Sequence, residues 1–173
     1  MNEAEFLFTE ALGCDKASLY LNRDKYLESE KIYFISEVFK RRLKGEPLQY
    51  ILGSAEFMGI SLKVNKDVLI PRPETEILVE TSLSYIGTPD EPIARVSPKV
   101  LDLGTGSGCI AISLAKYLAP LVIDASDISG AALDVARENA AFNGLKVNFI
   151  QSDLFAGLQC KEYDFIISNP PYI

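Results

Sequence analysis

The sequence contains no histidine among its 173 residues. This absence excludes a Ser-His-Asp triad, a Cys-His nucleophile pair and any metal centre that depends on histidine ligands. Cysteine is scarce as well, because Cys14, Cys109 and Cys160 are the three in the chain and lie far apart. We therefore predict neither a disulfide framework nor a Cys-x-x-Cys site, but reduced, buried thiols and no bound metal. Any chemistry must come from backbone groups, carboxylates, amides and a cofactor.

Long apolar runs and a positive net charge are also missing. No apolar stretch approaches the roughly 20 residues that span a bilayer. The start of the chain, Met1 to Glu5, is acidic where a signal peptide would be basic. We therefore predict a cytoplasmic protein without a membrane contact. The net charge of −7 argues against stable nucleic-acid binding by the chain as a whole. The 48% of hydrophobic residues are sufficient for a globular core.

The most informative stretch of the sequence is residues 99–112. Val100 to Leu103 is a short apolar run typical of a buried strand, and Gly104, Gly106 and Gly108 follow at alternate positions. A helical apolar pattern begins at Cys109. The stretch therefore predicts a strand, a tight glycine turn and a helix. Glycine allows the required backbone angles and lets a ligand lie against the backbone amides, and the helix start offers unpaired N–H groups to an anion.

Three classes of ligand are bound by such a turn. A phosphate-binding P-loop is excluded, because Gly108 is followed by Cys109 and Ile110 and not by Lys-Ser/Thr. A dinucleotide site is disfavoured, because the third glycine comes one residue too early. The spacing Gly-x-Gly-x-Gly after Leu-Asp-Leu resembles the first motif of S-adenosylmethionine-dependent methyltransferases, in which the loop cradles the methionine part of the cofactor. A glycine-rich turn without a ligand is the remaining alternative.

The residues before the turn predict a helical lobe and a β-hairpin. Helical apolar spacing is present over residues 2–12, from Asp15 onwards, and over residues 29–45, where Ser29 is the expected N-cap. The basic run from Lys40 to Lys44 could meet an acidic partner or RNA, or could complement the helix dipole. Residues 55–64 predict a hairpin, and a further helix is expected from Pro73 to Gly87. Residues 88–98 are expected to form a loop.

Strands and helices alternate after the turn. Strands are predicted at residues 121–127, 147–150 and 163–167, and Ser129 is the expected N-cap of the helix between the first two. This alternation predicts an α/β fold with a doubly wound, mainly parallel, Rossmann-like sheet and right-handed crossovers. We place the helical lobe and hairpin in residues 1–70 and a cofactor-binding domain in residues 71–173.

Three aspartates fall within or at the ends of these strands. Asp127 lies roughly 20 residues past the glycine turn, the spacing at which a carboxylate accepts hydrogen bonds from ribose hydroxyls. Asp153 could accept a hydrogen bond from an adenine amino group, with Leu154 or Phe155 beside the ring. Asp102 lies within a strand, where a buried charge requires polar partners. Each could be an ordinary turn or cap residue, but together, beside the glycine turn, they favour an adenosyl ligand.

The last predicted strand is followed by Ser168-Asn169-Pro170-Pro171-Tyr172. Such a segment can be no more than a turn. It can also hold a planar amide, since Asn169 Oδ1 and the Pro170 carbonyl can accept its two N–H groups and Tyr172 can stack on its face. Methyl transfer to the amide nitrogen would then depend on orientation and on a fitted electrostatic site.

Four runs together resemble the HemK/PrmC family, the glutamine methyltransferases of peptide-chain release factors: Pro47–Gly53, Leu69–Glu76, Leu101–Ile112 and Ser168–Ile173. The resemblance implies that Asn169, Pro170, Pro171 and Tyr172 bind the substrate glutamine of a Gly-Gly-Gln loop. It also implies that the Arg72 segment lines the active site and that the helical lobe docks the release factor. The S-adenosylmethionine site implied in this way comprises Gly104, Thr105, Gly106, Ser107, Gly108, Asp127 and Leu154, and Asp153 is added to it from its position.

Two alternatives and one departure accompany this resemblance. Asn-Pro-Pro-Tyr also occurs in DNA methyltransferases that modify adenine or cytosine and in some RNA guanine methyltransferases, so a base methyltransferase is one alternative. A non-catalytic fragment is the other. Members of the family continue through three further strands, in the order 3-2-1-4-5-7-6, whereas the sequence stops at Ile173. We therefore expect residues 1–173 alone to be marginally stable and catalytically silent.

Overall fold

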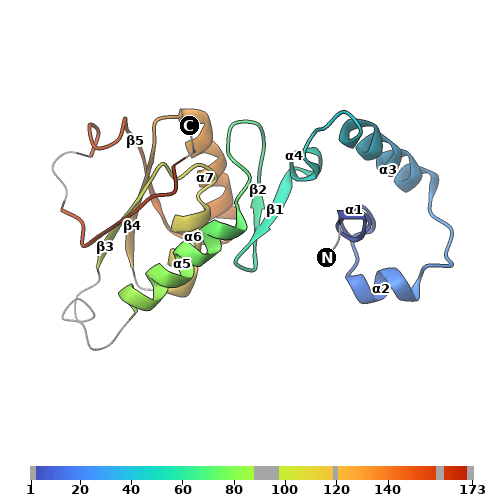
Figure 1. Cartoon of the computed structure of the whole chain (residues 1–173), viewed down its shortest axis with the longest axis horizontal. Helices are drawn as coiled ribbons and strands as arrows, with labels where there is room; N and C mark the ends of the chain where they lie inside the picture. Colours follow the sequence, from blue (N-terminus) through green and yellow to red (C-terminus); the bar gives the residue numbers. More distant parts are fainter. Residues whose placement is uncertain (1–2, 88–97, 119–120, 159–161, 171–173) are drawn as a thin grey trace. The chain divides into compact units, whose positions relative to one another are not determined.

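The computed structural model describes residues 3–87, 98–118, 121–158 and 162–170. The chain forms two compact units, Met1–Gly53 and Ser54–Ile173 (Figure 1). The predicted loop at residues 88–98 lies almost entirely outside the described residues. No helix within the described ranges has both the length and the apolar character needed to cross a membrane. The elements of the first unit are α1 (Glu3–Leu12), α2 (Lys16–Leu21), α3 (Ser29–Arg42) and α4 (Leu48–Leu52).

The first unit is the helical lobe that the sequence predicts. Its small core joins Leu7 of α1 to Val38 of α3 and Leu48 of α4. The prediction of Ser29 as the cap of α3 is wrong, because the N-cap is Glu28, whose side chain makes no capping hydrogen bond. The Glu28 carbonyl already accepts the Ile32 N–H at 3.1 Å, so the helix includes Ser29 as its first residue.

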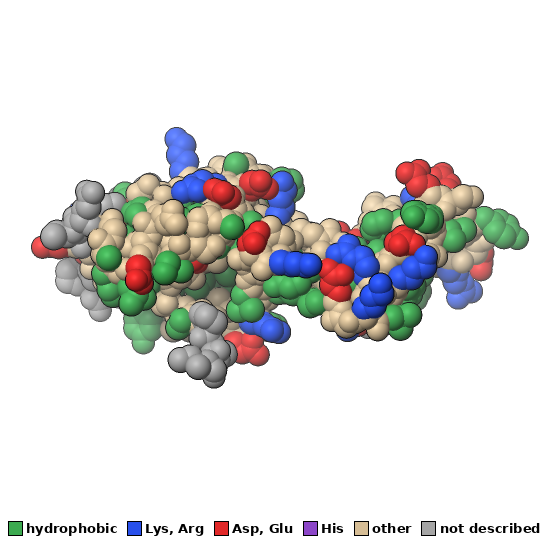
Figure 2. All heavy atoms as spheres, turned by 90° about the horizontal axis from the view of Figure 1, so that it is seen from above, with side chains coloured by type: hydrophobic (Ala, Val, Ile, Leu, Met, Phe, Trp, Pro, Cys, Tyr) green, Lys and Arg blue, Asp and Glu red, His purple; other side chains and the backbone are tan. Residues whose placement is uncertain are grey.

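Three cations of the basic run at the end of α3 are paired with carboxylates of the lobe itself. Lys40, Arg41 and Arg42 form ion pairs with Glu37, Glu46 and Glu3, respectively. On the surface of the first unit, blue cationic side chains accordingly lie beside red acidic ones (Figure 2). Exposed pairs of this kind contribute little stability, but they reduce the charge available to an outside partner. This arrangement favours the interpretation that the run complements the dipole of α3.

The second unit contains a four-stranded parallel sheet in the order β5-β4-β3-β6. This confirms the predicted α/β fold class, and the order equals the first four strands, 3-2-1-4, of the family pattern. The chain steps from β3 to β4 to β5 in one direction, so right-handed crossovers place α6 and α7 on the same face of the sheet (Figure 1). The bounds are β3 (Lys99–Leu103), β4 (Val122–Asp127), β5 (Asn148–Gln151), β6 (Phe165–Ile167), α5 (Pro73–Ile86), α6 (Cys109–Tyr117) and α7 (Gly130–Phe142).

Local chemistry explains where these helices begin. Ser129 is the N-cap of α7 as predicted, and its Oγ accepts the Ala132 N–H at 3.2 Å. Pro73 is the first residue of α5, where its missing N–H costs nothing. Cys109, the first residue of α6, is a buried free thiol, and burial raises its pKa to about 12. Cys14 is also free but only half-buried, and Cys160 lies outside the described residues.

The second unit begins with a hairpin of β1 (Ser54–Phe57) and β2 (Ile60–Lys63). Its strands alternate between buried and exposed side chains, and Phe57, Ile60 and Leu62 are each 1% exposed. These side chains join one hydrophobic core with residues of α5, α6 and β3. The sequence predicts the hairpin together with the helical lobe in residues 1–70, whereas in the structure its apolar face is buried in the core of the second unit.

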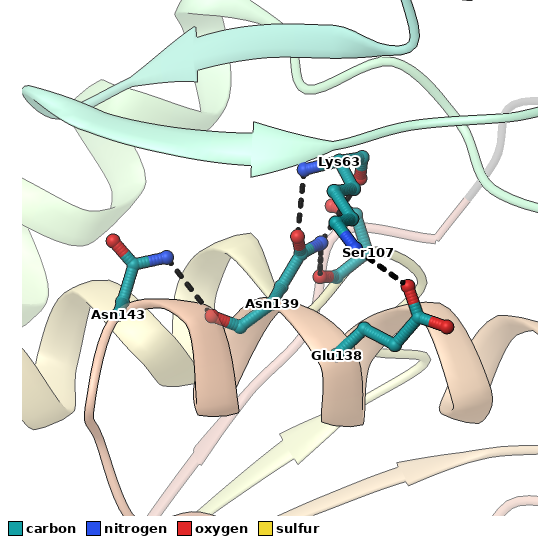
Figure 3. A network of polar contacts seen from close by, with 5 residues as sticks. All are labelled: Lys63, Ser107, Glu138, Asn139 and Asn143. Carbon is teal, nitrogen blue, oxygen red and sulfur yellow. Dashed lines mark hydrogen bonds and ion pairs between the residues drawn. The ribbon is translucent and has the colours of Figure 1, made fainter.

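A buried asparagine joins this hairpin to α7 and to the glycine turn (Figure 3). Asn139 is fully buried, its Oδ1 accepts the Lys63 N–H at 2.6 Å, and its Nδ2 donates to the Lys63 carbonyl at 3.0 Å and to the Ser107 carbonyl at 2.9 Å. One turn later, Asn143 Nδ2 donates to the Ser61 carbonyl at 3.1 Å. Four helical residues rise about 6 Å and two strand residues about 6.8 Å, so this i,i+4 pair matches alternate residues of β2.

Candidate active site

A cavity of about 520 Å³ lies at the carboxyl ends of all four parallel strands. Its lining includes residues from the end of each strand or from the loop that follows it. This edge of a parallel sheet is where ligands bind in open α/β folds. The strand ends contribute, among others, Leu103 (β3), Asp127 (β4), Asp153 (after β5) and Asn169 (after β6).

The glycine turn is held against the end of β4. The N–H groups of Gly104 and Thr105 both donate to the Ser126 carbonyl, at 2.8 and 2.9 Å. The Gly106 N–H donates to Asp127 Oδ2 at 2.9 Å. Gly104 and Gly106 both have positive φ angles, of 76° and 55°, which glycine adopts without strain. The backbone of the turn is therefore fixed before any ligand arrives.

The three glycines of the turn have different surroundings. A Cβ added at Gly104 or Gly106 would meet no atom within 4 Å, and both residues line the cavity. A Cβ at Gly108 would lie 2.9 Å from Ile112 Cδ1 and 3.2 Å from Ala136 Cβ. Gly104 and Gly106 therefore leave room for a ligand, whereas Gly108 allows α6 and α7 to pack closely.

We expect Gly108→Ala to destabilise the fold more than Gly144→Ala. Both residues have positive φ angles, 83° and 67°, but a Cβ at Gly144 would meet nothing within 4 Å. The two variants share the backbone strain, and only Gly108→Ala adds the clash with Ile112 and Ala136. Urea unfolding should show a free energy of unfolding about 1 to 3 kcal/mol lower for Gly108→Ala than for Gly144→Ala. Equal losses would contradict the packing role of Gly108.

Asp127 is shared between the turn and the cavity. Its Oδ2 accepts the Gly106 N–H at 2.9 Å, and its Oδ1 accepts the Ser129 N–H at 3.0 Å. A carboxylate has about four lone-pair sites, so each oxygen can accept one further hydrogen bond. The side chain can therefore bind a pair of hydroxyl groups in the cavity while it holds the turn.

The loop after β5 carries a strained residue at the cavity. Leu154 has a φ angle of 47°, a left-handed conformation that is uncommon for a residue with a side chain. Buried Ser152 holds it, because its hydroxyl donates to the Leu154 carbonyl at 2.7 Å and accepts the Gly157 N–H at 2.8 Å. Asp153 and Leu154 both line the cavity. Strain retained at a cavity wall is typical of a binding site.

Asp102 lies fully buried beneath the turn. Its Oδ2 accepts the Thr105 hydroxyl at 2.6 Å and the Ala111 N–H at 3.2 Å, while its Oδ1 has no hydrogen-bond partner among the described residues. Burial raises the pKa of this carboxyl to about 6, although the two hydrogen bonds act in the opposite direction. A buried carboxylate requires polar partners, and the structure supplies them for one of the two Asp102 oxygens. Thr105 is one of these partners.

The Asp102→Asn variant should alter how stability depends on pH. Asp102 releases its proton near pH 4 when unfolded but near pH 6 when folded, so the wild-type protein loses stability as the pH rises through this window. Asparagine can accept the same two hydrogen bonds without a charge. We expect similar free energies of unfolding at pH 4 and a variant more stable by about 2 kcal/mol at pH 7, measured by urea unfolding. A difference that does not grow with pH would contradict this account.

The segment after β6 is fixed by two side-chain hydrogen bonds. The Ser168 hydroxyl donates to the Leu103 carbonyl at 2.7 Å and so ties the segment to the end of β3. Asn169 Nδ2 donates to Thr75 Oγ1, in the first turn of α5, at 2.6 Å. Asn169 and Pro170 both line the cavity.

The structure places the predicted site residues in three groups. Arg72 is exposed just before α5, and Pro171 and Tyr172 lie outside the described residues. Thr105, Ser107 and Gly108 belong to the turn, but their recorded contacts are with Asp102, Asn139 and the α6–α7 packing. The cavity lining brings together Gly104, Gly106, Asp127, Asp153, Leu154, Asn169 and Pro170.

Sequence reasoning missed the residues that hold this lining. Thr75, Ser152 and Asn139 each contact a candidate site residue or its loop. The one signal in the sequence that could have identified Thr75 is its place in the run Leu69–Glu76, which resembles the family. No group of three or more Cys, Asp or Glu side chains suited to a metal ion occurs within the described part of the chain.

The fold and the site define a Rossmann-like methyltransferase domain, and residues 88–173 match the family model described as methyltransferase small domain. Residues 1–53 match the model of the PrmC N-terminal domain. Over nearly its whole length, the chain is similar to members of the family of release factor glutamine methyltransferases.

Relatives in this family match nearly the whole chain. The release factor glutamine methyltransferase of Geobacter sulfurreducens is 42% identical over 171 residues, which are 99% of this chain and 57% of the relative. That of Lactococcus lactis is 46% identical over 172 residues, 99% of this chain and 60% of the relative. The chain thus spans about three fifths of the length of these relatives.

Solved structures share the fold at lower identity. The T. thermophilus 16S rRNA methyltransferase RsmC, in complex with AdoMet and guanosine, aligns with a TM-score of 0.54 at 23% identity, covering 69% of this chain and 32% of that one. The N-terminal domain of human METTL16, in complex with SAH, aligns with a TM-score of 0.52 at 25% identity, covering 66% of this chain and 47% of that one.

Proposed function

We propose that the protein transfers a methyl group from S-adenosylmethionine to the side-chain amide nitrogen of the glutamine in the Gly-Gly-Gln loop of a peptide-chain release factor. The observation that carries this proposal is the cavity, which has the glycine turn and Asp127 on its wall together with Asn169 and Pro170. The glycine turn and Asp127 suit an adenosyl cofactor, and Asn169 and Pro170 suit a planar amide. The names of the relatives support the choice of substrate.

The cavity fits S-adenosylmethionine. Gly104 and Gly106 leave the space that a ligand against the backbone requires, and Asp127 keeps lone pairs for the ribose hydroxyls. Asp153 would accept from the adenine amino group, and Leu154 would lie beside the ring. Thr105, Ser107 and Gly108 would complete the turn around the methionine part. When bound, the cofactor supplies a methyl group activated by a sulfonium.

Orientation of the substrate amide is the contribution of the protein's own residues. Asn169 Oδ1 and the Pro170 carbonyl would accept the two N–H groups of the glutamine, and Tyr172 would stack on its face, beside Pro171. An amide nitrogen is a poor nucleophile because its lone pair is delocalised, so the rate depends on aiming it and on stabilising the developing charge. We assign no general base, because the acceptors orient the amide and the proton that its nitrogen loses on methylation can pass to water after the transfer.

The Arg72 segment would border the substrate site, and the helical lobe would dock the release factor. The free thiols of Cys14 and Cys109 support a cytoplasmic location. We expect no stable nucleic-acid binding, consistent with the net charge of −7.

A methyl-transfer assay tests this function directly. The protein expressed from its complete reading frame is incubated with methyl-labelled S-adenosylmethionine and, in parallel, with a release factor, with the same factor whose loop glutamine is replaced by alanine, and with duplex DNA or ribosomal RNA. We expect label on the intact release factor alone, located at the glutamine amide by mass spectrometry. Label on nucleic acid would favour a base methyltransferase, and binding of the cofactor without transfer would favour a non-catalytic protein.

A further inference from the structure

Thr75 presents a buried hydroxyl to a candidate catalytic residue. It is 4% exposed and lies in the first turn of α5, where its N–H donates to the Arg72 carbonyl at 2.9 Å. Its Oγ1 accepts a hydrogen bond from Asn169 Nδ2 at 2.6 Å, across 94 residues of sequence. A buried hydroxyl is costly without a partner, so this contact accounts for a polar residue at a position that burial would otherwise make apolar.

This hydrogen bond fixes the position and plane of the Asn169 amide at the cavity, with Nδ2 as the end that faces Thr75. The amide nitrogen is a donor and the amide oxygen an acceptor, and the two ends differ little in shape. With Nδ2 directed to Thr75, Oδ1 is the end left for a substrate. The reversed amide would place an NH₂ donor against the NH₂ group of a glutamine. The orientation therefore decides whether Asn169 attracts or repels the substrate amide.

The first turn of α5 is itself held in place. Glu76, next to Thr75, accepts the Met58 N–H on its Oε1 at 2.7 Å. Met58 occupies the turn of the hairpin with a φ angle of 50°, which is a strained conformation for a residue with a side chain. Such a conformation persists only where surrounding contacts hold it, so Glu76 is bonded to a fixed backbone group. Thr75 thus acts from a fixed support.

We propose that Thr75 is a positioning residue that sets the orientation of the Asn169 side chain for methyl transfer. This inference rests on the proposed function, in which Asn169 Oδ1 accepts from the substrate amide. Thr75 is absent from the cavity lining, so its action is through Asn169. The run Arg72–Glu76, which belongs to the family resemblance, thus contacts the site through Thr75.

A pair of substitutions at residue 75 separates the hydroxyl from the shape of the side chain. Thr75→Val keeps the volume and removes the acceptor, whereas Thr75→Ser keeps the hydroxyl. We expect Thr75→Val to lower kcat at least about tenfold, with the cofactor Kd unchanged by calorimetry, and Thr75→Ser to stay within about threefold of wild type. The control is Thr81→Val, the same change on the same helix at an exposed residue whose hydroxyl bonds the Ile77 carbonyl. Wild-type turnover in Thr75→Val, or equal losses in the Ser and Val variants, would overturn the proposal.

A second measurement distinguishes this proposal from the proposed function. The side-chain NH₂ signal of Asn169, assigned by its absence in Asn169→Ala, is followed in a proton–nitrogen correlation spectrum. We expect Thr75→Val, and not Thr75→Ser or Thr81→Val, to shift this signal and to speed its hydrogen exchange. A wild-type protein that methylates no release factor would overturn the proposed function. An Asn169 signal unchanged in Thr75→Val would overturn the role of Thr75 whatever the activity.

Discussion

The Asn169→Ala variant is expected to lose methyl transfer by at least about a hundredfold, while the affinity for S-adenosylmethionine stays within a few-fold. Asn169 lines the cavity beside Pro170, and it is held there by Thr75 and by the neighbouring Ser168–Leu103 bond. Alanine removes the oriented acceptor and leaves the glycine turn and Asp127 untouched. The loss should therefore appear in kcat with release factor as substrate, and calorimetry with the cofactor should show little change.

A surface variant provides the control for this experiment. Glu80→Ala changes an exposed residue of α5 and should leave both turnover and cofactor affinity as in the wild type. Near-normal turnover in Asn169→Ala would refute the assignment of Asn169 to the substrate amide. A parallel loss of cofactor affinity would instead place Asn169 in the cofactor site.

The Asp127→Asn variant should bind S-adenosylmethionine about tenfold to a hundredfold more weakly, since hydrogen bonds to a carboxylate contribute roughly 1.5 to 3 kcal/mol. Two effects act together. The variant loses the charge that binds the ribose hydroxyls, and its amide NH₂ must face either the Gly106 N–H or the Ser129 N–H, both of which are donors. The glycine turn thereby loses a contact that fixes it. Calorimetric titration with the cofactor measures the change.

Asp134→Asn is the matched control for this variant. Asp134 is an exposed residue of α7 that pairs with Arg137, so the same chemical change occurs outside the cavity. Its cofactor affinity should equal that of the wild type. Unchanged affinity in Asp127→Asn would move the ribose contact to another residue.

Features that depend on neighbours in sequence were predictable from the sequence. The strand before the glycine turn, the helix after it and the Ser129 cap each follow from a local pattern, and the structure has all three. The parallel sheet follows from the alternation of strands and helices, because right-handed crossovers leave few other arrangements. The carboxyl ends of parallel strands share one edge of the sheet, so the sequence predicts that Asp127, Asp153 and Asn169 lie near one another.

Features that depend on contacts distant in sequence were not predictable. The bond between Thr75 and Asn169 spans 94 residues, and no periodicity marks it. The hairpin was predicted with the helical lobe and lies in the second unit, because an alternating pattern shows that one face is buried but not what buries it. The left-handed Leu154 was not predictable for a different reason: leucine disfavours that conformation, and the bond that Ser152 makes to it only two residues away follows no recognisable pattern. The N-cap of α3 was also mispredicted. The prediction of Ser29 relied on the preference of N-caps for serine, whereas the cap is Glu28, whose side chain makes no capping bond.

The amides that α7 directs at β2 also protect a sheet edge. The outer edge of a two-stranded hairpin presents unpaired N–H and C=O groups, which can template pairing with a strand of another molecule. Here Asn139 engages both backbone groups of Lys63, and Asn143 engages the Ser61 carbonyl. A helix thus satisfies, with side chains, three of the backbone groups that a third strand would otherwise bond. Because the same Asn139 amide holds the Ser107 carbonyl, a substitution that exposed this edge to self-association would also loosen the glycine turn.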